Sequence, residues 1–123
     1  MAEEKPIDID DPDVDMDPGG RLLHRGVLFT GEVEERSGGV VVSLDSYVDG
    51  VQHGPSRDWY KGGVLRAEAT ARSGRPVGVS KAWYPNGTLA TEQVFSEDGL
   101  TILVDRQWDE TGRPTKNWSP DEG

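Results

Sequence analysis

The sequence predicts an all-β protein, an antiparallel meander of β-hairpin repeats with a period of about 24 residues. Three observations predict it: a stretch that nearly repeats itself, turn signals about every dozen residues, and the absence of sustained helical periodicity. Because short hairpin turns join strands that run back past each other, these signals indicate an antiparallel sheet.

The repeat lies between residues 48 and 95, where GVQHGPSRDWYKGGVLRAEA is followed by GRPVGVSKAWYPNGTLATEQ. A fixed short period indicates that each copy is one supersecondary unit, which buries its apolar side chains only by stacking on its neighbours. The residues that return 24 positions later are Gly50, Gly54, Ser56, Trp59, Tyr60, Gly63, Leu65 and Glu68, as Gly74, Gly78, Ser80, Trp83, Tyr84, Gly87, Leu89 and Glu92.

Each copy is predicted to be a β-hairpin. Asn86-Gly87 suits a two-residue type I′ turn, which needs positive φ at both central residues. Gly62-Gly63 occupies the same place in the earlier copy. The expected cross-strand pairs are Tyr84–Leu89, Trp83–Ala90 and Lys81–Glu92 in one copy, and Tyr60–Leu65, Trp59–Arg66 and Arg57–Glu68 in the other.

Alternation of side chains then separates two faces of the sheet. One face carries the tyrosines and leucines among small residues, namely Ala67, Ala69, Ser80 and Ala82. The other carries the tryptophans beside pairs of opposite charge. We expect the tyrosine and leucine face to be packed and the tryptophan face to be exposed to water.

The strand-like runs between turn signals continue toward both ends, where the copies are degenerate. Trp108 and Gly112 stand 25 residues after Trp83 and Gly87, so one residue is inserted, and we place it near Ser96–Gly99 as a bulge or a longer loop. The runs are Val27–Glu35, Val40–Tyr47, His53–Tyr60, Val64–Ala71, Val77–Tyr84, Leu89–Phe95 and Leu100–Trp108.

Composition divides the chain into three parts. Residues 1–20 hold eight acidic residues and Lys5, which is −7 of the net charge of −10. Their aspartates and prolines favour a mobile acidic arm, with an edge strand as the alternative. Residues 21–117 are the predicted repeat domain, and residues 118–123 a disordered tail.

The acidic arm also contains a partial calcium-loop pattern. Asp13, Asp15 and Asp17 have the spacing of the first ligands. Pro18 stands where such a loop needs glycine, and His24 where it needs a bidentate glutamate. The sequence therefore favours a solvated arm over a calcium site.

Composition also limits the cellular compartment and the class of binding partner that we expect for this chain. The chain has no cysteine, opens with Met-Ala-Glu-Glu-Lys and has no apolar segment of signal-peptide or membrane-span length, so we expect a cytoplasmic protein. Nucleic acid is disfavoured as a partner because binding phosphates requires a basic surface. Net acidity favours a basic protein partner instead, although it also serves solubility alone.

No group of residues indicates catalysis, a metal or a cofactor. His24 and His53 are the two histidines, and their spacing matches no metal motif. Glu68 and Glu92 recur opposite cations, which indicates cross-strand pairing rather than acid–base chemistry. The recurring serines lack a nucleophile elbow. We therefore expect a protein that is not an enzyme.

The pattern G-x-x-x-G-x-x-x-x-W-Y-x-x-G-x-L, present from Gly50 to Leu65 and from Gly74 to Leu89, resembles the MORN-variant repeat of bacterial YwqK-type antitoxins. LLHRGVLFTGEV, residues 22–33, is similar to the G-x-x-F-T-G opening of that family. The resemblance covers about residues 20–115 and implies a β-hairpin-repeat sheet and an antitoxin or immunity role. The last copy departs from it, since Asp109 replaces the tyrosine and Leu103 the second glycine.

The predicted function is therefore non-catalytic protein binding, as an antitoxin or immunity protein that covers a basic toxin. A scaffold or structural repeat module without a toxin is the alternative. The tryptophans have two interpretations: a stacked ladder that stiffens an exposed sheet, or an interface with a charged rim. The predicted partner-binding residues are Arg57, Trp59, Glu68, Lys81, Trp83, Glu92, Arg106 and Trp108.

Overall fold

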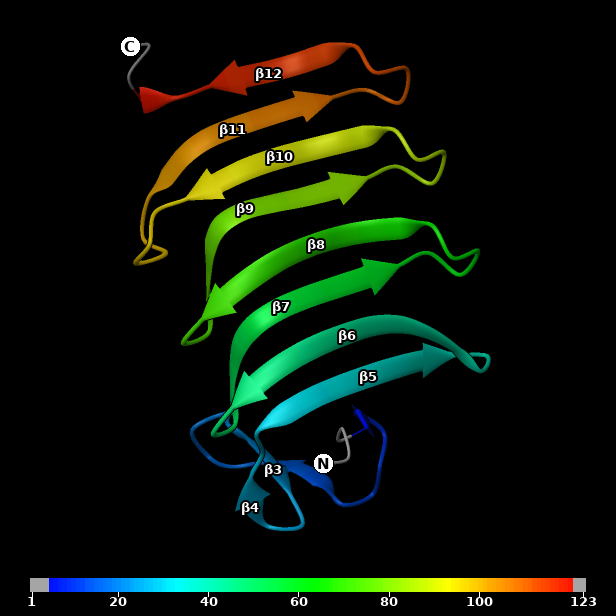
Figure 1. Cartoon of the computed structure of the whole chain (residues 1–123), viewed down its shortest axis with the longest axis vertical. Helices are drawn as coiled ribbons and strands as arrows, with labels where there is room; N and C mark the ends of the chain where they lie inside the picture. The colour runs from blue at the N-terminus through cyan, green and yellow to red at the C-terminus, as the bar shows by residue number, and fades with distance from the viewer. Residues whose placement is uncertain (1–4, 121–123) are drawn as a thin grey trace.

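The computed structural model describes residues 5–120 and contains strands but no helix in that range (Figure 1). Within it, no helix is long and apolar enough to cross a membrane. The strands are β1 (Ile7–Asp8), β2 (Val14–Met16), β3 (Leu22–His24), β4 (Val27–Leu28), β5 (Gly31–Ser37), β6 (Val40–Val48), β7 (Val51–Trp59), β8 (Leu65–Arg72), β9 (Arg75–Trp83), β10 (Leu89–Phe95), β11 (Ile102–Trp108) and β12 (Pro114–Trp118).

Nine strands form one sheet in the order β1-β5-β6-β7-β8-β9-β10-β11-β12. From β5 to β12 each strand pairs antiparallel with the next along the chain, and β1 pairs in parallel with β5. A smaller sheet of β2, β3 and β4 lies at the β5 end (Figure 1). The all-β class and the antiparallel hairpins predicted from the sequence are confirmed.

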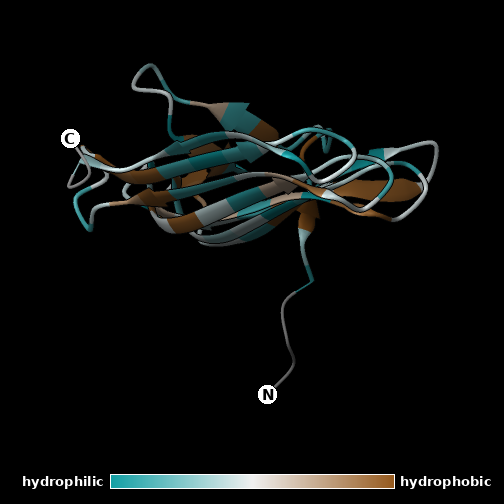
Figure 2. Cartoon of the chain, turned by 90° about the horizontal axis from the view of Figure 1, so that it is seen from above, coloured by the Kyte–Doolittle hydropathy of each residue, from teal (hydrophilic) through white to brown (hydrophobic). Residues whose placement is uncertain are grey.

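The large sheet is a single layer, and its two faces differ less than the sequence predicts. Seen from above, hydrophobic and hydrophilic residues are interspersed along it (Figure 2). Leu22, Val33 and Val77 are the buried hydrophobic residues of the described range. Tyr60 and Tyr84 are only half-buried. The expectation of a packed tyrosine face was wrong, because no second layer of the described chain covers it.

The hairpin turns are of two kinds. Asp49-Gly50 and Ser73-Gly74 are two-residue turns with positive φ at both positions, as type I′ requires. Asn86-Gly87, predicted to be such a turn, belongs instead to a three-residue loop. Gly87 N–H donates to the Tyr84 carbonyl at 2.9 Å, and of Asn86 and Gly87 only Gly87 has positive φ. The same three-residue loop forms after Tyr60 and after Asp109, where Lys61 and Glu110 stand in place of Pro85, so glycine with positive φ at the third loop position is the shared feature.

The extra loop residue changes the pairs next to the turn but not those farther away. Trp83 pairs with Leu89 instead of Ala90. Ala90 is left without a partner, so that Lys81 still pairs with Glu92. The earlier hairpin repeats this arrangement: Trp59 pairs with Leu65, Arg66 is unpaired, and Arg57 pairs with Glu68. Leu65 and Leu89 therefore lie on the tryptophan face, not on the tyrosine face as predicted.

Both features that the inserted residue near Ser96–Gly99 predicted, a longer loop and a bulge, occur in the structure. The turn is longer, since Ser96 N–H donates to the Thr101 carbonyl at 2.9 Å. A bulge follows, because Val94 pairs with Val104 and Phe95 with Ile102, which leaves Leu103 unpaired. β12 then completes a last hairpin that the predicted strand runs omit. Trp118, expected in a disordered tail, is its final residue, whereas residues 121–123 lie outside the described range.

The described chain before β5 contains four short strands and contacts the rest of the large sheet at two places. Ile7 of β1 pairs with Val33 of β5, which is 3% exposed. Leu22 N–H donates to the Gly50 carbonyl at 2.8 Å, and Gly50 N–H donates to the Phe29 carbonyl at 2.8 Å. Backbone hydrogen bonds to Gly50, in the β6–β7 turn, thus hold the small sheet against the large one.

This contact predicts a difference between two glycines with the same φ of +79°. A Cβ at Gly50 would lie 2.8 Å from the Leu22 carbonyl oxygen, whereas one at Gly26 would meet open space. Gly26→Ala should lower the free energy of unfolding by about 1 kcal/mol, and Gly50→Ala by about 2 to 3 kcal/mol. Urea unfolding of both variants measures this, and equal losses would contradict the close contact.

Candidate functional site: an exposed interaction surface

One face of the sheet, which we call the ladder face, carries a row of alternating charge across five strands. Successive cross-strand pairs join Arg57 to Glu68, Glu68 to Lys81, Lys81 to Glu92 and Glu92 to Arg106. Paired residues of neighbouring strands project to the same side of a sheet. The positive and negative side chains therefore lie side by side in one line.

The distances show that the line is continuous around Glu92. Its carboxylate lies 3.8 Å from Lys81 Nζ and 3.2 Å from Arg106 Nη1. Arg57 Nε lies 3.8 Å from Glu68 Oε2. Two of these ion pairs follow from the predicted register, and the Arg106–Glu92 pair adds a third. Because these side chains are solvent-accessible, each pair is worth at most about 1 kcal/mol of stability.

A row of tryptophans runs beside the charges on the same face. Trp59, Trp83 and Trp108 each stand two residues after a cation of the charge row, on the same strand, so side-chain alternation brings them to the same side. All three are half-buried. The structure thus brings the eight predicted partner-binding residues onto one face, including Trp108, whose register was uncertain from the sequence.

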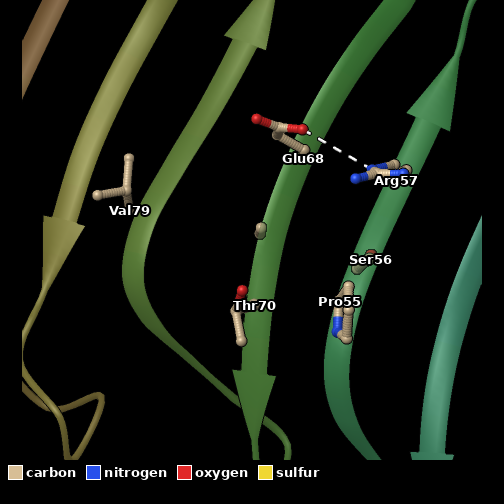
Figure 3. Close-up of a pocket in the computed structure, with 7 residues that line it drawn as sticks. Pro55, Ser56, Arg57, Glu68, Thr70 and Val79 are labelled. Carbon is tan, nitrogen blue, oxygen red and sulfur yellow. Dashed lines mark ion pairs between the residues drawn. The ribbon is translucent and has the colours of Figure 1, made fainter.

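A shallow depression of about 220 Å³ adjoins the charge row on the side away from the tryptophans (Figure 3). The ion pair of Arg57 and Glu68 borders it, and Val79 lies at its far side with half of its surface exposed. Sequence reasoning missed this part of the surface. The available signal was side-chain alternation, which puts Val79 on the same face as Lys81 two residues later. The depression is lined by Pro55, Ser56, Arg57, Glu68, Ala69, Thr70 and Val79.

The tyrosines of the opposite face hold the backbone under the tryptophans. Tyr60 Oη donates a hydrogen bond of 2.7 Å to the Trp83 carbonyl, and Tyr84 Oη donates one of 2.7 Å to the Trp108 carbonyl. Each bond reaches from one hairpin to the next. The tyrosines that follow Trp59 and Trp83 in the sequence therefore restrain the position of the next tryptophan in the row.

The opposite face also carries acidic groups with shifted pKa values. Burial raises the pKa of Asp58, and the charge of Asp45 adds to this, while Arg66 opposes it. A hydrogen bond from Lys116 lowers the pKa of Asp105, which is 7% exposed, and burial opposes that effect. Asp45 accepts hydrogen bonds from Ser56 and Gln52. These carboxylates therefore have a structural role, because each of them interacts with a side chain of a neighbouring strand.

The arm brings together a different set of acidic residues from the predicted calcium-loop pattern. Carboxylate and imidazole atoms of Asp11, Asp13 and His24 lie within 4.8 Å of one another. Arg25 Nε is already 3.1 Å from the Asp13 carboxylate, which neutralises one of these groups. His53, the other histidine, accepts a hydrogen bond from Ser73 N–H at 3.3 Å. We assign no metal to this cluster.

No protein-family model, curated protein or solved structure that we compared matches this chain. The candidate surface is therefore argued from the residues of this chain alone. The ladder face is the region in which the greatest number of predicted functional residues meet.

The Asp105–Lys116 contact predicts a pH dependence of stability. Lys116 Nζ lies 2.8 Å from Asp105 Oδ2 and lowers the pKa of this carboxyl in the folded state. A lowered folded-state pKa contributes stability above the unfolded value of about 4, and that contribution is lost as pH falls through the folded-state pKa. Lys116→Gln should raise the pKa of Asp105 and reduce the loss of stability as pH falls below about 4.

Lys61→Gln is the matched control, because it removes the same charge from an exposed turn. NMR titration of the Asp105 carboxyl and urea unfolding across this pH range provide the two measurements. Unchanged titration of Asp105 in Lys116→Gln would contradict the assigned cause.

Proposed function

We propose that this chain is a non-catalytic protein-binding module that uses the ladder face as its interface, and that it acts as an antitoxin or immunity protein. One observation carries the proposal: the tryptophan row lies beside an alternating charge row on a sheet face that no other described part of the chain covers. A surface of this kind has the composition of an interface rather than of a reaction site.

The composition matches what protein interfaces select. Tryptophan and arginine are the residue types most enriched among those that dominate binding energy. Here they project from paired strands, so little backbone entropy is lost when a partner binds. The ion pairs contribute little to stability, but they pre-orient charged groups that a partner of complementary pattern would recognise.

Contacts that recur at the predicted period support the resemblance to MORN-variant repeats. The Tyr60–Trp83 hydrogen bond has its counterpart in Tyr84–Trp108, where the tyrosine stands 24 residues and the tryptophan 25 residues later. Three turns share one pattern of backbone hydrogen bonds, in which Gly63, Gly87 and Gly112 each donate to the residue three positions before. We take the chain to be an array of such repeats, and this extends the antitoxin role of the resembling family to it as a hypothesis.

Charge favours a basic partner. The net charge of −10 steers association toward a positive surface, and it resides mainly in the first twenty residues, while the ladder row itself carries three cations and two anions. We propose that the overall negative charge accelerates the encounter with the partner, and that the alternating charges of the ladder face fix the position in which the partner binds. A toxin domain that acts on nucleic acid has the required charge, and a cytoplasmic setting suits a chain without cysteine.

The first test is co-expression with the product of the adjacent gene. If the proposal holds, that product arrests growth alone, growth recovers when both chains are present, and the two co-purify. Failure of both rescue and co-purification would favour the competing scaffold role, in which the exposed sheet binds other proteins without a toxin.

The second test separates binding from folding with neighbouring residues on opposite faces. Trp83→Ala should weaken binding of the co-purified partner about 30-fold, which corresponds to about 2 kcal/mol. Tyr84→Phe should weaken binding no more than about threefold, through the position of Trp108, and should lower the free energy of unfolding by about 1 kcal/mol, since it leaves the Trp108 carbonyl without its hydroxyl donor.

Calorimetric titration and thermal unfolding of both variants supply the four quantities needed. If Trp83→Ala lost stability with unchanged affinity, the tryptophans would serve only to stiffen the sheet.

A further inference from the structure

The two ends of the large sheet differ in how they present their outer strands. At one end β1 lies outside β5, and the small sheet lies nearby (Figure 1). At the other end β12 is the outermost strand of the described residues. An outer strand presents unpaired N–H and C=O groups, so β12 is open to pairing with another strand.

The second half of β12 is suited to such pairing. The first half of β12 is irregular, because Pro114 has no N–H to donate and Thr115 is unpaired in a bulge. Prolines and bulges are features by which natural sheets prevent pairing at their edges. Lys116, Asn117 and Trp118 then pair regularly with β11. Trp118 is 45% exposed, and it lines an apolar groove together with Leu100, Ile102 and Lys116.

We propose that β12 pairs antiparallel with β12 of a second copy of this chain, in a register centred on Asn117. In this register Lys116 of each copy faces Trp118 of the other, so the lysine side chain of each copy packs against the indole of the other. Lys116 Nζ lies 2.8 Å from the Asp105 carboxylate on β11, so the aliphatic stem of Lys116 is the part that covers the indole of the other copy. A register centred on Lys116 would instead set two lysines against each other, which is unfavourable.

The symmetry of this pairing favours a second copy over a different partner. Each β12 offers a cation and an indole at positions that exchange under a two-fold axis, so the edge is complementary to itself. The pairing joins the two β12 edges, and the remaining edge of each copy presents only the two-residue strand β1, which offers little backbone for further pairing. The ladder face stays free in the dimer, so the inference does not depend on the proposed toxin.

Single cysteine variants test the register, because the natural chain contains no cysteine. In the proposed dimer the two Asn117 positions face each other within the Cα separation that a disulfide spans. The two Thr115 positions would be about 13 Å apart or more. Under mild oxidation Asn117→Cys should therefore form at least ten times more covalent dimer than Thr115→Cys. Equal cross-linking of the two variants would overturn the register.

Sedimentation measurements on the unmodified chain test the dimer itself. The mass should rise from monomer to dimer between about 10 and about 500 µM, as expected for a short edge contact. Trp118→Lys should weaken this association at least tenfold, since it places a lysine opposite Lys116. Val40→Lys is the matched control, because Val40 is also 45% exposed but lies at the β5–β6 turn.

A monomer at all concentrations would overturn the proposal and leave the edge to a strand of a different protein. Equal weakening by Trp118→Lys and Val40→Lys would also overturn it, since the effect would then come from added charge rather than from the β12 edge.

Discussion

Backbone hydrogen bonding between neighbouring strands is the interaction on which the rest of this structure depends. A chain of 123 residues with only three buried hydrophobic side chains in its described part has no thick core to hold its strands. Each strand from β5 to β11 is instead held on both sides by its neighbours. Side chains also link neighbouring hairpins, since the Tyr60 hydroxyl donates a hydrogen bond to the Trp83 carbonyl of the next hairpin.

This mode of stabilisation explains why both faces are available for binding. A sheet inside a layered protein hides at least one face in the core, whereas here the ladder face and the tyrosine face both meet solvent. The spacing between strands, about 4.8 Å, sets the spacing of the charge row and of the cross-strand pairs. A partner therefore meets a surface whose pattern is set by the backbone rather than by mobile loops.

The stacked turns connect this surface to the rest of the chain. At the β6–β7 turn, Gly50 brings its backbone against Leu22 and so positions the small N-terminal sheet. At the β10–β11 turn, Gly99 lies where a Cβ would be 2.8 Å from the Pro76 carbonyl oxygen. Glycine at these turns thus allows close approach between successive connections as well as positive φ.

The sequence by itself determined the all-β class, the hairpin order and the pairs Arg57–Glu68 and Lys81–Glu92, because alternation and turn signals are local properties of the chain. The tertiary structure decided the pairs beside the turns. The extra loop residue and the unpaired Ala90 offset each other, so the distant pairs were predicted correctly while Trp83 was paired wrongly. It also decided that no layer of the described residues covers the tyrosine face and that β12 extends to Trp118, since burial and edge position depend on contacts that no local pattern records.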